Sequence, residues 1–174
     1  MSRVRIGIAG AGGMGKHHAR ILSARDDTQI VALFDTDPVA MNRLEKSLGV
    51  SVQALNHYSS LSAMIDSDKL DGLVIATPHT RHADQVRTGL EAGLHVLVEK
   101  PMALSLEHCD EMIAAAESNN VKLMAGYSQH FYGTSLKAKE ILDSEYWTNA
   151  ESKIKSFLAS GHTPEPEPED APIS

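Results

Sequence analysis

The chain has 174 residues, a net charge of −7, 42% hydrophobic residues and 22% charged residues, which is ordinary for a globular protein with one buried core. The acidic balance argues against a nucleic-acid partner, because neutralising phosphates requires clustered lysine and arginine. No apolar run approaches the roughly 18 residues of a membrane span, so no membrane partner is expected. The single cysteine, Cys109, and an N-terminal apolar run interrupted by glycines favour a cytoplasmic protein over a secreted one.

Short apolar runs alternate with longer amphipathic patterns along the chain. The runs predict strands at 4–10, 30–35, 72–77, 95–99 and 122–127, with a weaker candidate at 51–55. The amphipathic patterns predict helices at 16–24, 38–49, 59–67, 82–93, 105–120 and 135–144. Alternating strands and helices indicate an α/β fold with a mostly parallel sheet covered on both faces. Right-handed crossovers make this a doubly wound, Rossmann-like sheet.

Two regions of the chain differ in composition. Residues 1–145 carry the alternating pattern and are expected to form one domain. Residues 146–174 are expected to form a short helical extension and a disordered acidic tail. The chain closes in TPEPEPEDAPIS, where four prolines and four acids stand without a base. Such a segment cannot bury enough apolar surface to fold.

A glycine pattern follows the first predicted strand. The residues GAGGMG contain the spacing Gly10-x-Gly12-x-x-Gly15, and Asp35 ends the second strand. In this context the pattern is the dinucleotide fingerprint, whose glycines permit a tight turn, close approach of a pyrophosphate and close helix packing. An aspartate at that place accepts hydrogen bonds from ribose hydroxyls and repels a 2′-phosphate, which favours NAD over NADP. The cofactor-binding residues expected from this motif are Gly10, Gly12, Gly13, Met14, Gly15 and Asp35.

A second polar group follows the strand predicted at 72–77. Thr77, Pro78, His79 and His82 are expected at the ligand edge, because ligands bind outside the carboxyl ends of the strands. One interpretation places His79 or His82 against the nicotinamide. The other is a surface histidine at a helix start. No metal site is expected, because no cysteine or acid cluster accompanies the histidines.

Lys100 follows the apolar run VLV, with Glu99 before it and Pro101 after it. At the ligand edge a lysine can hydrogen-bond a substrate oxygen, and burial would favour the neutral amine that shuttles a proton. Glu99 could instead contact the nicotinamide ribose. A solvated Glu-Lys pair at a strand end is an equally open alternative on these residues alone.

The sequence resembles the N-terminal domain of the Gfo/Idh/MocA family of oxidoreductases. The matching segments are IGIAGAGGMGKHHARIL, FDTDP, ATPHTRHAD, LEAGLHVLVEKPMALSLEHCDEMIAAA and GYSQHFYG, in family order over about residues 3 to 143. The resemblance implies an NAD(P)-dependent oxidation of a hydroxyl on a sugar or polyol. It also implies that Lys100 is the catalytic lysine of the EKP element, and that the Lys100-Pro101 bond is cis.

The chain departs from the family pattern in three places. His79 stands where the family usually has asparagine, and Gln129-His130 stand where it has a basic pair; Gln129 is kept as a candidate cofactor residue. The family's second domain, which supplies substrate contacts and further catalytic residues, has no counterpart in residues 146–174. We therefore expect an oxidoreductase domain that is incomplete alone and meets a partner chain or a second copy. The alternatives are a non-catalytic NAD-binding or interaction module and a truncated gene product.

Overall fold

The computed structural model describes residues 3–49, 55–67 and 69–159. The chain forms two compact units, residues 1–127 and 128–174. This division falls before residue 145, and the expected domain boundary at that residue stays a prediction. In the part of the chain that the structure describes, no helix is long and apolar enough to cross a membrane.

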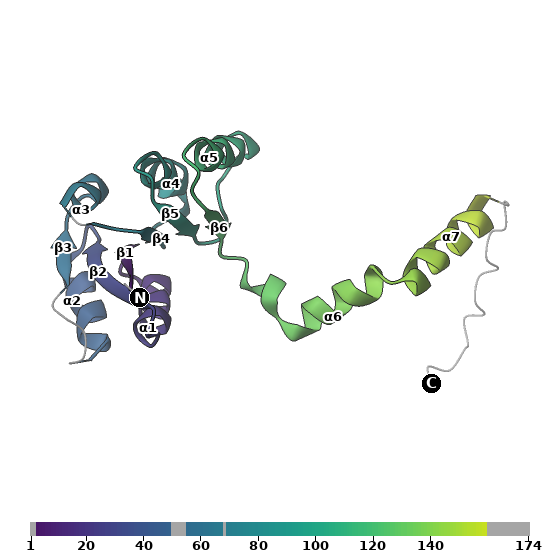
Figure 1. Cartoon of the computed structure of the whole chain (residues 1–174), viewed down its shortest axis with the longest axis horizontal. Helices are drawn as coiled ribbons and strands as arrows, with labels where there is room; N and C mark the ends of the chain where they lie inside the picture. The colour runs from purple at the N-terminus through teal and green to yellow at the C-terminus, as the bar shows by residue number, and fades with distance from the viewer. Residues whose placement is uncertain (1–2, 50–54, 68, 160–174) are drawn as a thin grey trace, which may run out of the picture. The chain divides into compact units, whose positions relative to one another are not determined.

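The first unit is built on a six-stranded parallel sheet in the order β3-β2-β1-β4-β5-β6, as Figure 1 shows. This is the strand order of the doubly wound dinucleotide-binding fold, so the predicted fold class is confirmed. The strands are β1 (Val4–Ala9), β2 (Thr28–Phe34), β3 (Asn56–Tyr58), β4 (Gly72–Ile75), β5 (His95–Val98) and β6 (Leu123–Ala125).

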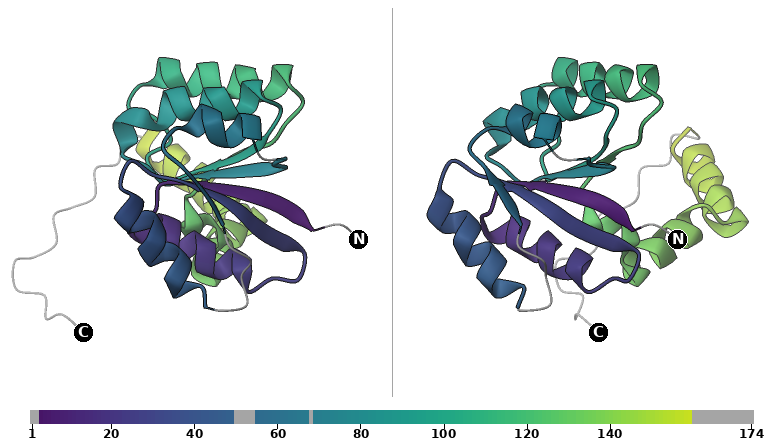
Figure 2. Two further views of the ribbon diagram at one scale, coloured as in Figure 1. Left: turned by 90° about the vertical axis from the view of Figure 1, so that its left-hand side faces the viewer. Right: turned by 60° about the vertical axis from the view of Figure 1, so that its left-hand side comes forward.

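Helices cover both faces of the sheet. In Figure 2, α1 and α2 lie on one face and α3, α4 and α5 on the other. Their bounds are α1 (Gly13–Ser23), α2 (Pro38–Ser47), α3 (Leu61–Ser67), α4 (His82–Glu91) and α5 (Leu106–Ser118), with a short 3-10 turn, η1 (His79–Arg81), before α4. Ser105 caps α5, because its Oγ accepts a hydrogen bond from the His108 N–H at 3.2 Å.

The two helical layers explain the continuously apolar strands. Ile8 packs in one core cluster with Leu33 and Leu44, whereas its neighbour Ala9 packs in the other with Ile75 and others. Successive strand residues point to opposite faces, so a strand buried on both faces is apolar at every position.

The weak strand expected at 51–55 lies outside the described residues except for Leu55. The strand β3 begins at Asn56 and pairs with Ala32–Phe34 of β2. Leu55 is buried just before the strand, where its N–H donates to Glu45 Oε1 at 2.9 Å. An edge strand pairs on one side only, and polar residues are tolerated there.

The second unit comprises η2 (Ser128–Phe131), α6 (Gly133–Leu142) and α7 (Glu145–Ala159). None of its side chains that the structure describes is buried. Phe131, Leu136 and Ile154 are each more than half exposed. These helices thus lack a core of their own in the described residues.

Candidate functional site

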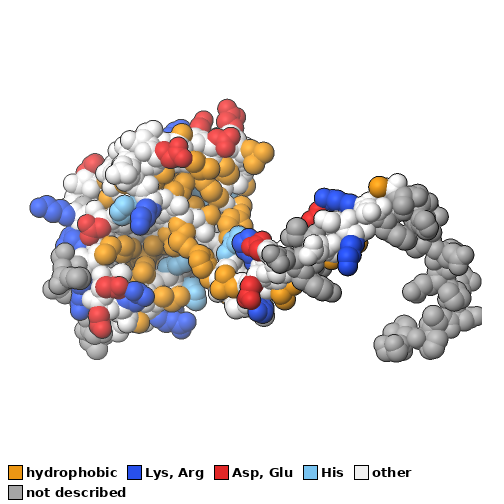
Figure 3. Space-filling model, turned by 45° about the vertical axis from the view of Figure 1, so that its right-hand side comes forward, with side chains coloured by type: hydrophobic (Ala, Val, Ile, Leu, Met, Phe, Trp, Pro, Cys, Tyr) orange, Lys and Arg blue, Asp and Glu red, His pale blue; other side chains and the backbone are white. Residues whose placement is uncertain are grey.

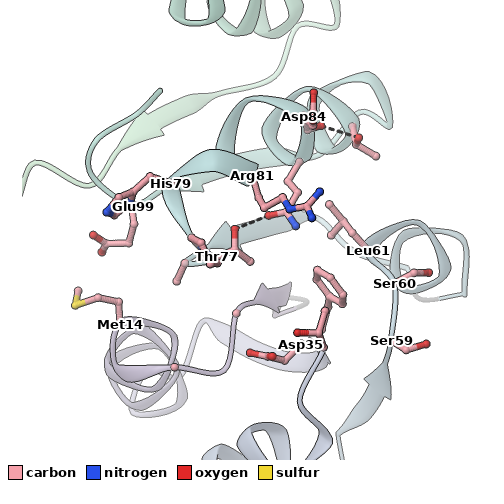
Figure 4. A pocket seen from close by; sticks show the side chains of 18 of the residues that line it. Met14, Asp35, Ser59, Ser60, Leu61, Thr77, His79, Arg81, Asp84 and Glu99 are labelled. Carbon is pink, nitrogen blue, oxygen red and sulfur yellow. Dashed lines mark hydrogen bonds between the residues drawn. The ribbon is translucent and has the colours of Figure 1, made fainter. Parts of the chain in front are cut away.

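A cleft of about 1070 Å³ opens at the carboxyl ends of β1, β2, β4 and β5. Figure 4 shows Met14 and Glu99 at one end of this cleft and Asp35, Ser59 and Ser60 at the other. The structure brings together most of the residues expected from the sequence. They are Gly10, Gly12, Gly13, Met14, Asp35, Thr77, Pro78, His79, Glu99 and Lys100.

Gly10 and Gly15 shape the turn between β1 and α1. Gly10 has φ +98°, and a side chain there would collide with the Ala76 carbonyl group. Its N–H donates to the Phe34 carbonyl oxygen at 2.7 Å. Gly15 is buried, and a side chain there would collide with the Gly10 carbonyl oxygen. Gly15 therefore does not line the cleft but lets α1 approach β1, as the fingerprint predicts.

Gly12 and Gly13 differ, because no atom lies within 4 Å of a Cβ built at either position. Gly12 is also the N-cap of α1, which has no side-chain cap and no acidic residue in its first turn. By contrast, Asp37 caps α2 by accepting from the Val39 N–H at 2.8 Å. The first N–H groups of α1 are thus left for a ligand, and with the helix dipole they suit a phosphate.

Asp35 is tied to the glycine loop. Its Oδ2 accepts from the Ala11 N–H at 2.7 Å, and its Oδ1 accepts from the Asp37 N–H at 2.9 Å. Each carboxylate oxygen can accept a further hydrogen bond. The side chain is half-buried in the lining of the cleft, so its free lone pairs are placed for ribose hydroxyls.

His82 lies in the core behind the cleft. It is 0% exposed, its Nδ1 lies 2.8 Å from the Pro101 carbonyl oxygen and its Nε2 lies 2.9 Å from the Thr77 carbonyl oxygen. The interpretation as a surface histidine is wrong for His82, because its ring is fully buried and faces two carbonyl oxygens. His82 is also not among the residues that line the cleft, so its side chain is not accessible to a cofactor bound there. It connects the turn after β4 to the turn after β5.

Lys100 and Glu99 follow β5 at one end of the cleft. The Lys100-Pro101 peptide bond is cis, as the family resemblance implies. Lys100 is exposed, and its ammonium group makes no hydrogen bond or ion pair with any described residue. The burial expected for its amine is therefore absent. Glu99 is 6% exposed, and His18 Nε2 donates to its Oε1 at 2.7 Å.

Thr77, Pro78 and His79 line the cleft, as expected, and Figure 4 shows His79 beside Glu99. The Thr77 hydroxyl donates to Gln85 Oε1 at 2.5 Å, which Figure 4 shows as a dashed line. Gln129 lies in η2, in the second unit, and its contact with the cofactor stays a prediction. In the described ranges no group of three or more His, Cys, Asp or Glu could hold a metal ion.

Several lining residues were not expected from the sequence. Ser59, Ser60 and Ser62 line the cleft directly after β3 (Asn56–Tyr58), a strand that was not expected at those residues. Arg81 lines the cleft from η1. It belongs to no motif spacing and does not directly follow a strand, so the sequence carries no signal for its position. His18 was not expected at the site either, because its contact with Glu99 joins residues far apart in the sequence.

A Rossmann sheet, a glycine loop with an uncapped helix and an acid at the end of β2 define a dinucleotide-binding domain. Residues 4–127 match the Gfo/Idh/MocA oxidoreductase family, NAD-binding Rossmann fold. The chain therefore belongs to this family, and NAD is the cofactor of its Rossmann domain.

Known relatives extend beyond this chain. It is 34% identical over 140 residues to an uncharacterized oxidoreductase of Streptococcus pneumoniae, covering 80% of this chain and 36% of that protein. It is also 34% identical over 131 residues to the rhizopine catabolism protein MocA of Rhizobium meliloti, covering 75% and 39%. Among solved structures, scyllo-inositol dehydrogenase of Lactobacillus casei with NAD(H) and scyllo-inositol superposes with a TM-score of 0.73 at 26% identity, covering 82% of this chain and 41% of the other. The chain thus spans about two fifths of the length of these proteins.

Proposed function

We propose that this chain is the cofactor half of an oxidoreductase that transfers a hydride between NAD and a hydroxyl or keto carbon of a sugar or polyol. The observation that carries the proposal is the position of Lys100, at the end of the cleft away from Asp35 and with an ammonium group unpaired among the described residues. The substrate class is supported by the related inositol dehydrogenase, which binds NAD(H) and scyllo-inositol. A cytoplasmic location belongs to the same proposal, and the single cysteine supports it.

Each part of the cleft has a distinct task in this proposal. The α1 N-terminus and Gly12 bind the pyrophosphate, Asp35 binds the adenosine ribose, and Thr77 to His79 line the cleft toward Glu99. NAD supplies the hydride acceptor when it is bound. Lys100 Nζ, as the neutral amine, accepts the proton of the substrate hydroxyl, and as ammonium it returns a proton to the carbonyl oxygen in the reverse direction.

The exposure of Lys100 limits what the chain does alone. A base works best when its surroundings favour the required protonation state and exclude water. The ammonium group of Lys100 is exposed to solvent, so its surroundings meet neither requirement. Orienting the substrate is also worth up to roughly 7–11 kcal/mol of the barrier, and Lys100 alone cannot orient a polyol. We therefore expect the 174-residue chain to bind NAD and to oxidise polyols very slowly or not at all.

Exposed apolar side chains of the first unit bear on association. Leu104, Leu106, Met124 and Tyr127 of the first unit are exposed, and hydrophobic side chains gather on the face seen in Figure 3. Large exposed apolar areas mark interaction surfaces, so we propose that another polypeptide, a partner chain or a second copy, covers this face. Sedimentation equilibrium of the purified chain tests the second-copy form, and a monomer at all concentrations points to the partner chain.

Calorimetric titration with NAD, followed by assays of NADH formation with a panel of polyols and sugars, tests the function. Binding with turnover far below the usual 1–10³ s⁻¹ of enzymes is the expected result. Turnover within that range, abolished by Lys100→Ala, would show that the chain works without a cover. A lack of NAD binding would overturn the proposal.

A further inference from the structure

The Glu99 carboxylate is a nearly buried charge that borders the cleft. It is 6% exposed yet belongs to the cleft lining. Its Oε1 accepts from His18 Nε2 at 2.7 Å, and its Oε2 accepts from the Lys100 N–H at 3.2 Å. The backbone at Gly126 closes a third side, since a Cβ built there would lie 3.4 Å from Oε1. A buried charge persists when it is paired and hydrogen-bonded, and these contacts hold the carboxylate in one position.

This carboxylate lies at the end of the cleft where the two forms of the cofactor differ. In a doubly wound sheet the two halves of the dinucleotide lie on either side of the switch point between β1 and β4. Asp35 marks the adenosine side and Glu99, after β5, marks the other. Oxidised nicotinamide carries a positive charge that reduced nicotinamide lacks, and the rest of the cofactor is the same. A fixed charge at this end can therefore distinguish the two forms.

We propose that Glu99, positioned by His18, makes the cleft prefer oxidised over reduced cofactor. The inference rests on the proposed binding of NAD in this cleft. Lys100 has the opposite charge but does not cancel the effect, because it is exposed and water and salt screen exposed charges. The buried carboxylate acts through a lower effective dielectric.

His18 sets the net charge of the pair. Its neutral ring donates Nε2–H and leaves the pair at −1, whereas its protonated ring makes the pair neutral. The preference for NAD over NADH is therefore larger when the His18 ring is neutral than when it is protonated.

Other charged groups around α1 do not duplicate this pair. The His17 ring, with its centroid 5.9 Å from that of His18, is exposed, and His79 lines the same end of the cleft. Of the elements packed against α1, β2 and β4 carry no titratable side chain. On β1, Arg5 bonds the Lys69 carbonyl oxygen. On α2, Glu45 pairs with His57, and the other charged residues, Arg43 and Lys46, are exposed.

The test compares the dissociation constants of the whole chain for NADH, by nucleotide fluorescence, and for NAD, by competition. In Glu99→Gln the ratio of the NADH constant to the NAD constant should fall about tenfold, as expected for a unit charge several ångström away in a partly buried site. Glu99→Asp keeps the charge and should keep most of the preference. Asp35→Asn, at the other end, should weaken both cofactors equally and leave the ratio unchanged.

The pH profile of the ratio tests the positioning role of His18. His18→Gln keeps a neutral donor to Glu99 and should flatten the profile, whereas His17→Gln should retain it. An unchanged ratio in Glu99→Gln with both cofactors bound, or a profile that survives His18→Gln, overturns this inference and leaves the proposed function intact. If the unmodified chain binds neither cofactor, the proposed function fails and the inference fails with it. If Glu99→Gln does not fold, the His18→Gln profile decides.

Discussion

The two ends of the cleft are built in different ways. The glycine-loop end uses consecutive backbone from Gly10 to Gly15 and one carboxylate, Asp35, that accepts backbone N–H groups at 2.7 and 2.9 Å. The lysine end joins residues from four places in the chain, including His18 on α1 and His82 at the start of α4. The first end is defined by where side chains are absent, and the second by buried polar side chains.

The difference determines how each end fails when it is changed. Where glycine is needed because backbone passes close by, an added side chain must displace that backbone. Such a substitution lowers the free energy of unfolding. Where buried polar groups connect loops, removal of one partner leaves another unsatisfied, which costs free energy without abolishing the fold. Substitutions at the lysine end should therefore lower the stability of the protein by intermediate amounts and leave it folded.

The largest expected effect separates two glycines of the same loop. Gly15→Val drives a side chain into the Gly10 carbonyl and should lower the free energy of unfolding by more than about 4 kcal/mol, leaving little folded protein. Gly12→Val meets no atom within 4 Å and should fold normally. It should still bind NAD at least about 100-fold more weakly, about 2.8 kcal/mol, because its side chain occupies the space of the pyrophosphate. Urea denaturation followed by circular dichroism, together with NAD titration, measures both.

Each of these two variants serves as the control for the other. A stable Gly15→Val protein would show that α1 can shift away from β1 without loss. An unchanged NAD affinity in Gly12→Val would mean that the loop is only a turn.

At the lysine end, His82→Ala should reduce the free energy of unfolding by about 1–3 kcal/mol, because a neutral imidazole donates one N–H and its loss leaves a part-buried carbonyl oxygen without that donor. The two ring nitrogens lie against the carbonyl oxygens of Thr77 and Pro101. His17→Ala is the matched control, because His17 is exposed and such changes stay within about 0.5 kcal/mol. Equal stability of the two variants in urea would refute the connecting role of His82.

The sequence predicted the glycine-loop end better than the lysine end for a physical reason. The turn, the uncapped helix and Asp35 follow one another at short, fixed spacing, so a local pattern contains their geometry. The contacts of His18 with Glu99 and of His82 with Pro101 depend on how helices dock on the sheet. Those residues look the same in sequence as exposed histidines. The serines after β3 were missed for a third reason, since Asn56–Tyr58 is a polar edge strand and pairing with β2 outweighs its weak propensity.

A smaller effect is expected where the glycine-loop end recognises the ribose. Replacing Asp35 with alanine and Thr36 with arginine should shift the cofactor preference toward NADP(H) by about 10-fold or more, since hydrogen bonds to charged groups are worth about 1.5–3 kcal/mol. Asp35 also accepts the Ala11 and Asp37 N–H groups, so thermal melts must accompany the calorimetric titrations. Thr36→Arg alone keeps the repelling carboxylate and should shift the preference less. Tighter binding of NADPH than of NADH by the unmodified chain would contradict the role of Asp35.

The smallest effect should come from His79→Asn, which places the residue more usual in the family at the lysine end. The His79 ring is exposed and makes no side-chain hydrogen bond to a described residue. Its ring contacts His82 edge-on, with centroids 5.5 Å apart. Edge-on contacts of aromatic rings are worth about 0.5–1.5 kcal/mol, and exposure should keep this one at or below the lower limit. NAD affinity should change by less than about threefold, which is less than about 0.7 kcal/mol, in titrations run beside His82→Ala. A loss as large as that caused by Gly12→Val would show that His79 holds the cofactor directly, and that a single exposed side chain can matter as much as the backbone loop.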